Sequence, residues 1–274
     1  MRHDDLDPDK QRVAATYDAA ADHFDDDPLA FWERAGRATV ARLALPAGAR
    51  VLDVACGSGA SALPAAERVG PSGMVLAVDL ASQLLALGRA KAAARGLANI
   101  EFRQADMERL DLEAHAFDAV ICVFGIFFVD DMSALVASLW RLVRPGGQLA
   151  ITTWGPRMFE PGSALFWTAI RQERPELYRA FNPWDRITDP EALRQMLRAG
   201  GIEVAEIVPE AGTQALSSPE DFWTVALGSG YRGTIDQLEP AARERVHQAT
   251  LAALRAQDVR AIETNVIYAL ATKE

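Results

Sequence analysis

The sequence predicts an α/β fold built on a doubly wound, mainly parallel sheet. Short apolar runs alternate along the chain with segments of helical periodicity, which is typical of consecutive strand–helix–strand units. The first apolar run ends in a glycine-rich turn, Cys56-Gly57-Ser58-Gly59, and ligands bind at such turns in sheets of this class. With 274 residues, half of them hydrophobic, the chain is long enough for one large core that carries insertions.

Several elements have a local signal of their own. The helix after the glycines begins at once, because Pro64 lacks an N–H and is tolerated only in a first turn. Ser82 can cap the next helix, although Gly88 in its interior costs about 1 kcal/mol against Ala. A later helix starts at Asp189-Pro190, a cap followed by proline. Strands are expected at residues 50–55, 74–78, 100–105, 119–123, 148–153, 204–208 and 265–272, with helices at 60–69, from 82 to 96, at 132–143 and over most of 213–262.

The glycine-rich turn is compatible with more than one ligand. A P-loop would need a Gly-Lys-Ser/Thr ending that neutralises phosphate, and this turn has none, which excludes that mode of binding. Gly57, Gly59 and Ala62 do satisfy a relaxed dinucleotide spacing, and Asp79 follows Gly59 by 20 residues, at a strand end where an acid can bond ribose hydroxyls. These features alone fit a nicotinamide dinucleotide and S-adenosylmethionine equally well.

Three neighbouring features favour S-adenosylmethionine. Asp53 lies inside the first strand near its carboxyl end, where a carboxylate suits an ammonium and a sulfonium better than a pyrophosphate. The third strand ends in QADM (104–107), which provides a hydrogen-bond acceptor where an adenine amino group would lie. The fourth strand ends in ICVFG (121–125), an apolar stretch without a catalytic Lys or Tyr.

With these features the chain resembles the class I S-adenosylmethionine-dependent methyltransferases, in particular the branch of the ubiquinone and menaquinone C-methyltransferases and many bacterial small-molecule methyltransferases. The resemblance implies a Rossmann-like sheet of seven strands with an antiparallel last strand. It also implies S-adenosylmethionine as cofactor and S-adenosylhomocysteine as its product. The matching segments follow one another in the family's order, and they are DVACGSG (53–59), VD (78–79), ADM (105–107), FDAV (117–120) and LVRPGG (142–147).

The resemblance also assigns the cofactor-binding residues. Asp53 and Gly57 would border the methionine moiety, Gly59 would let the backbone approach it, and Asp79 would hold both ribose hydroxyls. Tyr17, on an amino-terminal helix, would cover the methionine end, unless it is simply a core residue of that helix. The remaining members of the expected site are Leu80 on the adenine face, Asp106 and Met107 at the adenine edge, and Ala55, Gln83, Cys122 and Val123.

Aromatic residues are concentrated in two segments outside the sheet, 154–188 and 213–262. They suggest an apolar acceptor pocket closed by a helical lid, although a cap with a small core of its own would account for about half of them. The expected reaction is methyl transfer to oxygen or carbon of a small, largely apolar acceptor that is aromatic or similar to a quinone or polyketide. The residues expected in the acceptor pocket are Phe128, Trp154, Trp167 and Trp223.

Methyl transfer depends on alignment and exclusion of water, so a base is needed only for a hydroxyl or an activated carbon. His23, the histidine nearest the amino-terminal helix that would cover the cofactor, is the candidate base. No metal-ligand spacing is present. Two other classes of protein remain alternatives. A nicotinamide-dependent oxidoreductase is disfavoured by Asp53 and by the lack of a Tyr-x-x-x-Lys motif. A non-catalytic S-adenosylmethionine-binding protein would have identical binding motifs.

Composition sets the expected partners and organisation. The net charge of −10 disfavours nucleic acid, and no apolar run approaches the roughly 20 residues of a membrane span. The acidic stretch 1–5 lacks the apolar core of a signal peptide, and only two cysteines are present, so a cytoplasmic protein is expected, with a homodimer as a candidate assembly. Residues 1–45 should form a helical cover, 46–212 with 263–274 the cofactor-binding core, and 213–262 an inserted helical lid.

Overall fold

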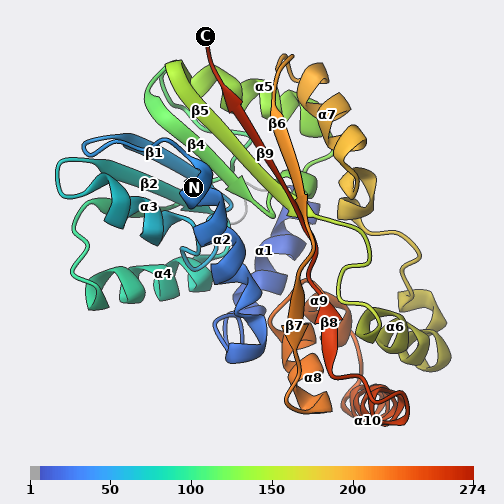
Figure 1. The fold of residues 1–274 in the computed structure, drawn as a ribbon. Coiled ribbons are helices and arrows are strands. Elements are labelled where there is room, and N and C mark those ends of the chain that lie inside the picture. Colours follow the sequence, from blue (N-terminus) through green and yellow to red (C-terminus); the bar gives the residue numbers. More distant parts are fainter. Residues whose placement is uncertain (1–6) are drawn as a thin grey trace.

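A seven-stranded sheet forms the centre of the computed structural model, which describes residues 7–274 (Figure 1). The acidic stretch at residues 1–5 lies outside the described residues. The strand order is β3-β2-β1-β4-β5-β9-β6. Neighbouring strands from β3 to β5 are parallel, whereas β9 runs antiparallel to both β5 and β6. The strands are β1 (Arg50–Val54), β2 (Met74–Asp79), β3 (Ile100–Gln104), β4 (Phe117–Val123), β5 (Val143–Trp154), β6 (Glu206–Glu210) and β9 (Val266–Thr272).

This topology confirms the predicted fold class, including the antiparallel last strand. Three strands differ from the sequence prediction by two or more residues at an end, among them β4, which begins at Phe117 rather than at Ala119. The strand β6 begins two residues later than expected, at Glu206, and β5 begins at Val143 rather than at Gln148. The Pro-Gly-Gly segment that was expected to precede the fifth strand is therefore part of it, and the pairing with β4 shifts register between Phe117 and Ala119.

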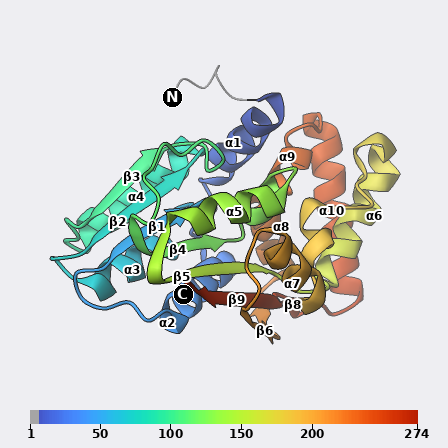
Figure 2. The ribbon, with the colours of Figure 1, turned by 90° about the horizontal axis from the view of Figure 1, so that it is seen from above.

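Helices cover both faces of the sheet (Figures 1 and 2). Alternate residues of the central strands point to opposite faces, so Val51 packs with one set of helices and Leu52 with the other. The first set is α2 (Phe31–Arg42), α3 (Ala62–Val69) and α4 (Ser82–Ala94), and the second is α5 (Met132–Leu142) and α7 (Pro190–Ala199). Because the direction of winding reverses between β1 and β4, a crevice opens at the carboxyl ends of these strands.

The cap of α4 corrects one sequence prediction. Ser82 is the first residue of this helix and does not cap it. Instead, Asp18 of helix α1 (Pro8–Ala20) accepts the backbone N–H of Gln83 at 2.8 Å. The glycine inside the helix also has a reason, since a Cβ on Gly88 would lie 2.5 Å from the ring of Phe102. Helix α1 is thus tied to the sheet domain by a helix cap.

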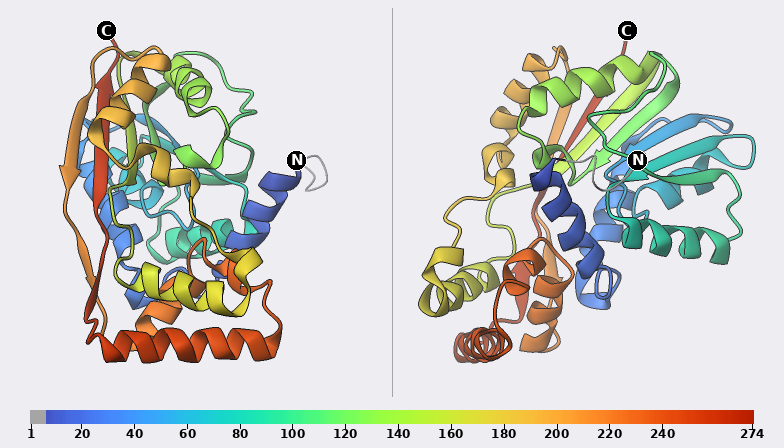
Figure 3. Two further views of the ribbon diagram at one scale, coloured as in Figure 1. Left: turned by 90° about the vertical axis from the view of Figure 1, so that its right-hand side faces the viewer. Right: turned by 180° about the vertical axis from the view of Figure 1, so that it is seen from behind.

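The chain between β5 and β9 adds a mainly helical part beyond the carboxyl ends of the strands (Figure 1). Figure 3 shows its two long helices, α6 and α10, side by side. Its large apolar residues belong to the same buried cluster as the sheet, with no separate core. Its elements are α6 (Gly162–Glu173), α8 (Pro219–Leu227), α9 (Arg232–Ile235), α10 (Pro240–Ala256), the 3-10 turns η4 (Pro175–Leu177) and η5 (Pro183–Ile187), and the strand pair β7 (Thr213–Ala215) and β8 (Ala261–Glu263). The same stretch of chain also contains α7 and β6, which belong to the sheet domain.

Within residues 7–274, no helix combines enough length with enough apolar character to span a membrane.

Candidate active site

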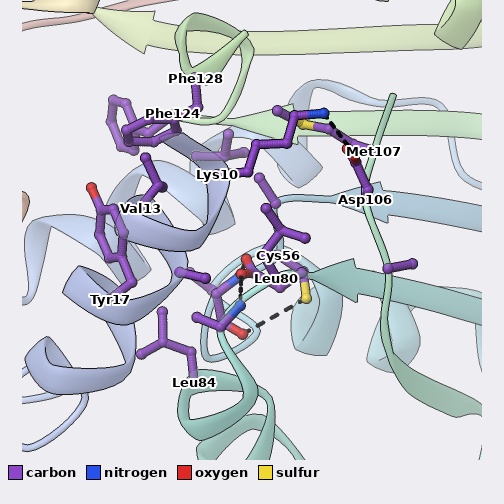
Figure 4. A pocket seen from close by; sticks show the side chains of 18 of the residues that line it. Lys10, Val13, Tyr17, Cys56, Leu80, Leu84, Asp106, Met107, Phe124 and Phe128 are labelled. Atoms are coloured by element: carbon purple, nitrogen blue, oxygen red, sulfur yellow. Dashed lines mark hydrogen bonds and ion pairs between the residues drawn. The ribbon is translucent and has the colours of Figure 1, made fainter. Parts of the chain in front are cut away.

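A cavity of about 110 Å³ lies at the carboxyl ends of β1 to β4, beneath α1 (Figure 4). Its walls include the glycine-rich turn after β1 and the residues at the carboxyl ends of β2, β3 and β4. Helix α1 and the turn η3 (Ile126–Phe128) close it from the other side. The sequence-predicted residues that line it are Tyr17, Ala55, Gly57, Asp79, Leu80, Asp106, Met107, Val123 and Phe128.

Four residues of the expected cofactor set do not line the cavity. Asp53 and Cys122 are fully buried in the strands beneath it. Gly59 has a φ of +91° and lies against Leu63, so it shapes the turn rather than the wall. Gln83 has an exposed side chain, and its backbone N–H is taken by Asp18.

Asp79 anchors the glycine-rich turn. One of its carboxylate oxygens accepts the N–H of Gly57 at 2.8 Å, and the other accepts the N–H of Ala81 at 2.8 Å. Burial raises the pKa of this carboxyl, and the two backbone donors act in the opposite direction. Each carboxylate oxygen can accept more than one hydrogen bond, so Asp79 retains capacity for two hydroxyl donors in the cavity.

Asp53 is an orphaned buried carboxyl one layer below the cavity. Ser61, which lines the cavity, donates its hydroxyl to Oδ2 of Asp53 at 2.7 Å, whereas Oδ1 has no hydrogen-bond partner. Burial, reinforced by the negative charge of Asp79, raises the pKa of Asp53 to about 7. A cation bound in the cavity would stabilise the ionised form and relieve this cost. The carboxyl groups of Asp53 and Asp79 therefore fit a ligand with an ammonium, a sulfonium and two ribose hydroxyls.

This raised pKa predicts a pH-dependent affinity for S-adenosylhomocysteine, whose ammonium pairs best with ionised Asp53. Below pH 7 the carboxyl holds a proton that binding must release, so affinity should rise about tenfold between pH 6 and pH 8. Calorimetry across this range measures it. An Asp53→Asn variant, which keeps the shape and has no charge, should bind with a flat profile. An equal slope in both proteins would exclude Asp53 as the titrating group.

Asp106 is 2% exposed and is held by a residue that the sequence did not reveal. Lys10 of α1 lies 2.6 Å from Asp106 and also pairs with Glu108, and Figure 4 shows it reaching across the cavity from the helix. Asp106 Oδ1 accepts the N–H of Glu108 at 3.0 Å. An adenine amino group at this edge would thus share the carboxylate with Lys10.

Other lining residues were missed as well. Several come from α1, α2 and the loop after β4, and others from the turns that follow β1, β2 and β3. Cys56, Ala105 and Phe124 lie inside the DVACGSG, QADM and ICVFG segments, so their positions at strand ends were a signal that could have found them. The further members of the wall are Lys10, Val13, Ala14, Phe24, Trp32, Cys56, Ala60, Ser61, Ala81, Leu84, Ala105, Phe124 and Val129.

The predicted acceptor residues are distributed over several places. Phe128 lines the first cavity, and its ring centroid lies 5.6 Å from that of Tyr17. Trp154, 2% exposed, borders a narrow second cavity, which we call the aromatic cavity. Trp167 borders a third cavity further out. Trp223 reaches none of these walls and stacks on the ring of His247 with centroids 4.4 Å apart.

His23, the candidate base, lies outside all three cavities. Its side chain is 34% exposed, and Nδ1 lies 2.8 Å from a carboxylate oxygen of Asp26. The structure therefore does not bring His23 together with the other predicted residues.

Known proteins are similar to this chain in sequence and in fold. Residues 51–147 match the family model described as a methyltransferase domain. Aklanonic acid methyltransferase DauC of Streptomyces sp. (strain C5) is 33% identical over 187 residues, which cover 64% of this chain and 85% of that protein. Nocamycin O-methyltransferase of Saccharothrix syringae is 30% identical over 250 residues, covering 86% of this chain and 85% of that protein.

A third relative and one solved structure extend the comparison. The ubiquinone/menaquinone biosynthesis C-methyltransferase UbiE of Pseudomonas putida (strain ATCC 700007) is 38% identical over 140 residues, covering 51% of this chain and 54% of that protein. The match thus spans about half of that relative. A putative methyltransferase from an antibiotic biosynthesis pathway of Anabaena variabilis ATCC 29413 shares the fold, with a TM-score of 0.60 at 16% identity, over 87% of this chain and 96% of that one.

The sheet, the cavity and these relatives define an enzyme of one class. The chain belongs to the class I S-adenosylmethionine-dependent methyltransferases. Its cofactor is S-adenosylmethionine, and it methylates a small molecule.

Proposed function

We propose that the protein transfers a methyl group to an oxygen or carbon atom of a small, largely apolar acceptor with a planar ring, aromatic or similar to a quinone or polyketide. The supporting observation is the aromatic cavity. It adjoins the first cavity, at the carboxyl ends of β1 to β4, which we call the cofactor cavity. Tyr17, Trp32 and Phe124 belong to the walls of both. An acceptor in the aromatic cavity would meet the cofactor cavity at these three side chains.

The walls of the aromatic cavity suit a flat apolar ring. Phe124 and Trp154 stack with centroids 4.1 Å apart, and Phe159 meets Trp154 edge-on at 5.4 Å. At about 20 Å³ the cavity is smaller than a ring, so acceptor binding has to move the walls apart. The proposed lid at residues 213–262 contributes Ser229, Gly230 and Tyr231 to these walls and would provide that movement.

The names of the relatives support the same acceptor class. They include a C-methyltransferase of ubiquinone and menaquinone biosynthesis, an O-methyltransferase for nocamycin and a methyltransferase for aklanonic acid. Because both carbon and oxygen methylation occur among them, the proposal keeps both.

The cofactor, when bound, supplies an electrophilic methyl group, and the protein's part is orientation and exclusion of water. Asp79 would hold the ribose, Asp106 and Met107 the adenine edge, and Asp53 the positive charge through Ser61. Burial raises the pKa of Tyr17 and raises that of Tyr231 to about 12, so both hydroxyls stay protonated. The hydroxyl of Tyr231 is hydrogen-bonded to Ser163 at 2.8 Å, and that of Tyr17 would be a donor to the acceptor. The proposal assigns no role to His23.

We propose a role for the amino-terminal part of the chain as well. Residues 1–45 act as the cover, since Lys10, Tyr17 and Trp32 all line the cofactor cavity. We also propose a cytoplasmic location, supported by the two free buried cysteines, and no nucleic acid partner, supported by the net charge of −10, with a homodimer as the candidate assembly.

A turnover screen tests the proposed function. The protein is incubated with S-adenosylmethionine and a panel of phenols, quinols and polyketide acids, and S-adenosylhomocysteine and the methylated acceptor are quantified by mass spectrometry. We expect products carrying one added methyl group with planar acceptors and none with polar, non-planar ones. Calorimetry with NAD, which should show no binding at micromolar concentrations, separates the oxidoreductase alternative. Tight cofactor binding without any methylated product would support the non-catalytic alternative instead.

A further inference from the structure

The third cavity has a different character from the first two. It measures about 360 Å³ and lies beside α6, between this helix and the loop that carries η4 and η5. Polar and charged side chains line most of it, in contrast to the aromatic cavity. We call it the arginine cavity, and its walls include Arg157, Glu160, Ser163, Thr168, Arg171, Tyr178, Arg179, Asn182, Asp185 and Tyr231.

Neighbouring cavities have lining residues in common. The cofactor cavity and the aromatic cavity have Tyr17, Trp32 and Phe124 in common. The aromatic cavity and the arginine cavity have Met158, Trp184 and Tyr231 in common. The aromatic cavity therefore lies between the other two. An acceptor that moves the walls of the aromatic cavity apart would have one end at the cofactor cavity and the other end at the arginine cavity.

Not every charge in the arginine cavity is available to a ligand. Arg157 pairs with Glu263 at 2.7 Å, and the carboxylate of Asp185 accepts the backbone N–H of Asn182 at 2.7 Å. Glu160 is the remaining acid on the wall, and it accepts a long hydrogen bond of 3.4 Å from the N–H of Ala164. Glu160 and Asp185 keep their negative charge, with no ion pair to a cation among the described residues, and Arg171 and Arg179 are the two cations on the wall besides the paired Arg157.

Arg171 and Arg179 have no carboxylate partner within 4 Å in the described part of the chain. The guanidinium of Arg171 lies 5.2 Å from the ring centroid of Tyr178, which holds it at the cavity wall. Two such cations beside one cavity stand out in a chain with a net charge of −10. A guanidinium presents paired donors that match the two oxygens of a carboxylate.

We propose that the arginine cavity binds an anionic oxygen group of the acceptor, a carboxylate, through Arg171 and Arg179. The acceptor is then a planar apolar acid, with its methyl-accepting atom at the cofactor and its carboxylate beyond Tyr231. This inference rests on the proposed function and narrows its substrate class. The arginines bind and orient the acceptor and take no part in the chemical step.

Two matched probes test the proposal, 6-hydroxy-2-naphthoate and its neutral isostere 6-hydroxy-2-naphthamide. Calorimetry is done on the whole protein saturated with S-adenosylhomocysteine. We expect the carboxylate to bind at least about tenfold more tightly than the amide, and added salt to reduce this preference. The double variant Arg171→Gln/Arg179→Gln should lose the preference and keep its affinity for the amide.

A second double variant controls for net charge. Arg194→Gln/Arg198→Gln removes two positive charges from α7, away from the cavity, and should keep the preference for the carboxylate. Arg171, Arg179 and Arg198 are exposed and Arg194 is half-buried in a surface ion pair with Glu191, so the fold should tolerate both changes. The proposal is overturned if wild-type protein with bound S-adenosylhomocysteine does not distinguish the probes or binds neither, or if both double variants behave alike. Failure to bind S-adenosylhomocysteine would instead count against the proposed function.

Discussion

Replacing Asp79 by Ala should weaken the binding of S-adenosylhomocysteine by about 2–4 kcal/mol, or roughly 30- to 1000-fold. The change removes the carboxylate that we propose as the acceptor for the ribose hydroxyls. It also releases the N–H groups of Gly57 and Ala81, so the glycine-rich turn loses its anchor. Calorimetry measures the affinity, and denaturant unfolding separates loss of binding from loss of the fold.

Two further variants make the test specific. Asp79→Asn keeps one oxygen acceptor for the turn and should bind more weakly than wild type but better than Asp79→Ala. Asp118→Asn is the matched control, because Asp118 accepts the backbone N–H of Arg50 at 2.7 Å and pairs with Arg144, away from the cavity. It should lower stability and leave cofactor affinity unchanged. Unchanged affinity in Asp79→Ala would refute the ribose assignment.

Replacing Trp154 by Ala should lower the free energy of unfolding by about 3–5 kcal/mol. The indole is 2% exposed and packs against Phe31, Trp32, Phe124 and Phe159, with centroid distances between 4.1 and 5.8 Å. Its removal leaves a void among aromatic side chains that cannot collapse around a methyl group. Urea titration of both proteins measures the difference.

Trp154→Phe separates packing from acceptor binding. It keeps an aromatic face and should recover much of the stability. If Trp154 also borders the bound acceptor, turnover per folded molecule should still fall by at least about tenfold, with cofactor affinity little changed. Trp140→Ala, at a partly exposed tryptophan on α5, should cost less stability and leave turnover normal. Normal turnover in Trp154→Phe would make this residue purely structural.

The cofactor cavity was predictable because its residues occupy defined places along single elements. In a parallel sheet the carboxyl ends of all strands meet at one edge, so an acid at the end of β2 and another after β3 must lie near the glycine turn. That rule brought Asp79, Asp106 and Gly57 together from their order in the chain alone. It failed for Cys122 and Gln83, because lining a cavity depends on side-chain direction and on neighbours such as Asp18.

No such rule applied to the residues predicted for the acceptor pocket. The concentration of aromatics predicted a pocket, but Trp223 and Trp154 could not be told apart until their neighbours were known. One stacks on His247 between α8 and α10, and the other lies in the cluster around Phe124. Helices that pack from distant parts of the chain decide such contacts, and hydrophobic periodicity is the same in either case.

The sequence by itself determined the sheet, its winding, the class of enzyme and the polar residues at the strand ends of the cofactor cavity, since these depend on local periodicity and on position along single strands. Only the tertiary structure decided how the wall is closed. Lys10 pairs with Asp106 across 96 residues, and Asp18 caps a helix that begins with Ser82. It also decided that Arg171 and Arg179 share a cavity with Tyr231. Long, flexible side chains form such contacts wherever packing brings them, and no spacing along the chain records that.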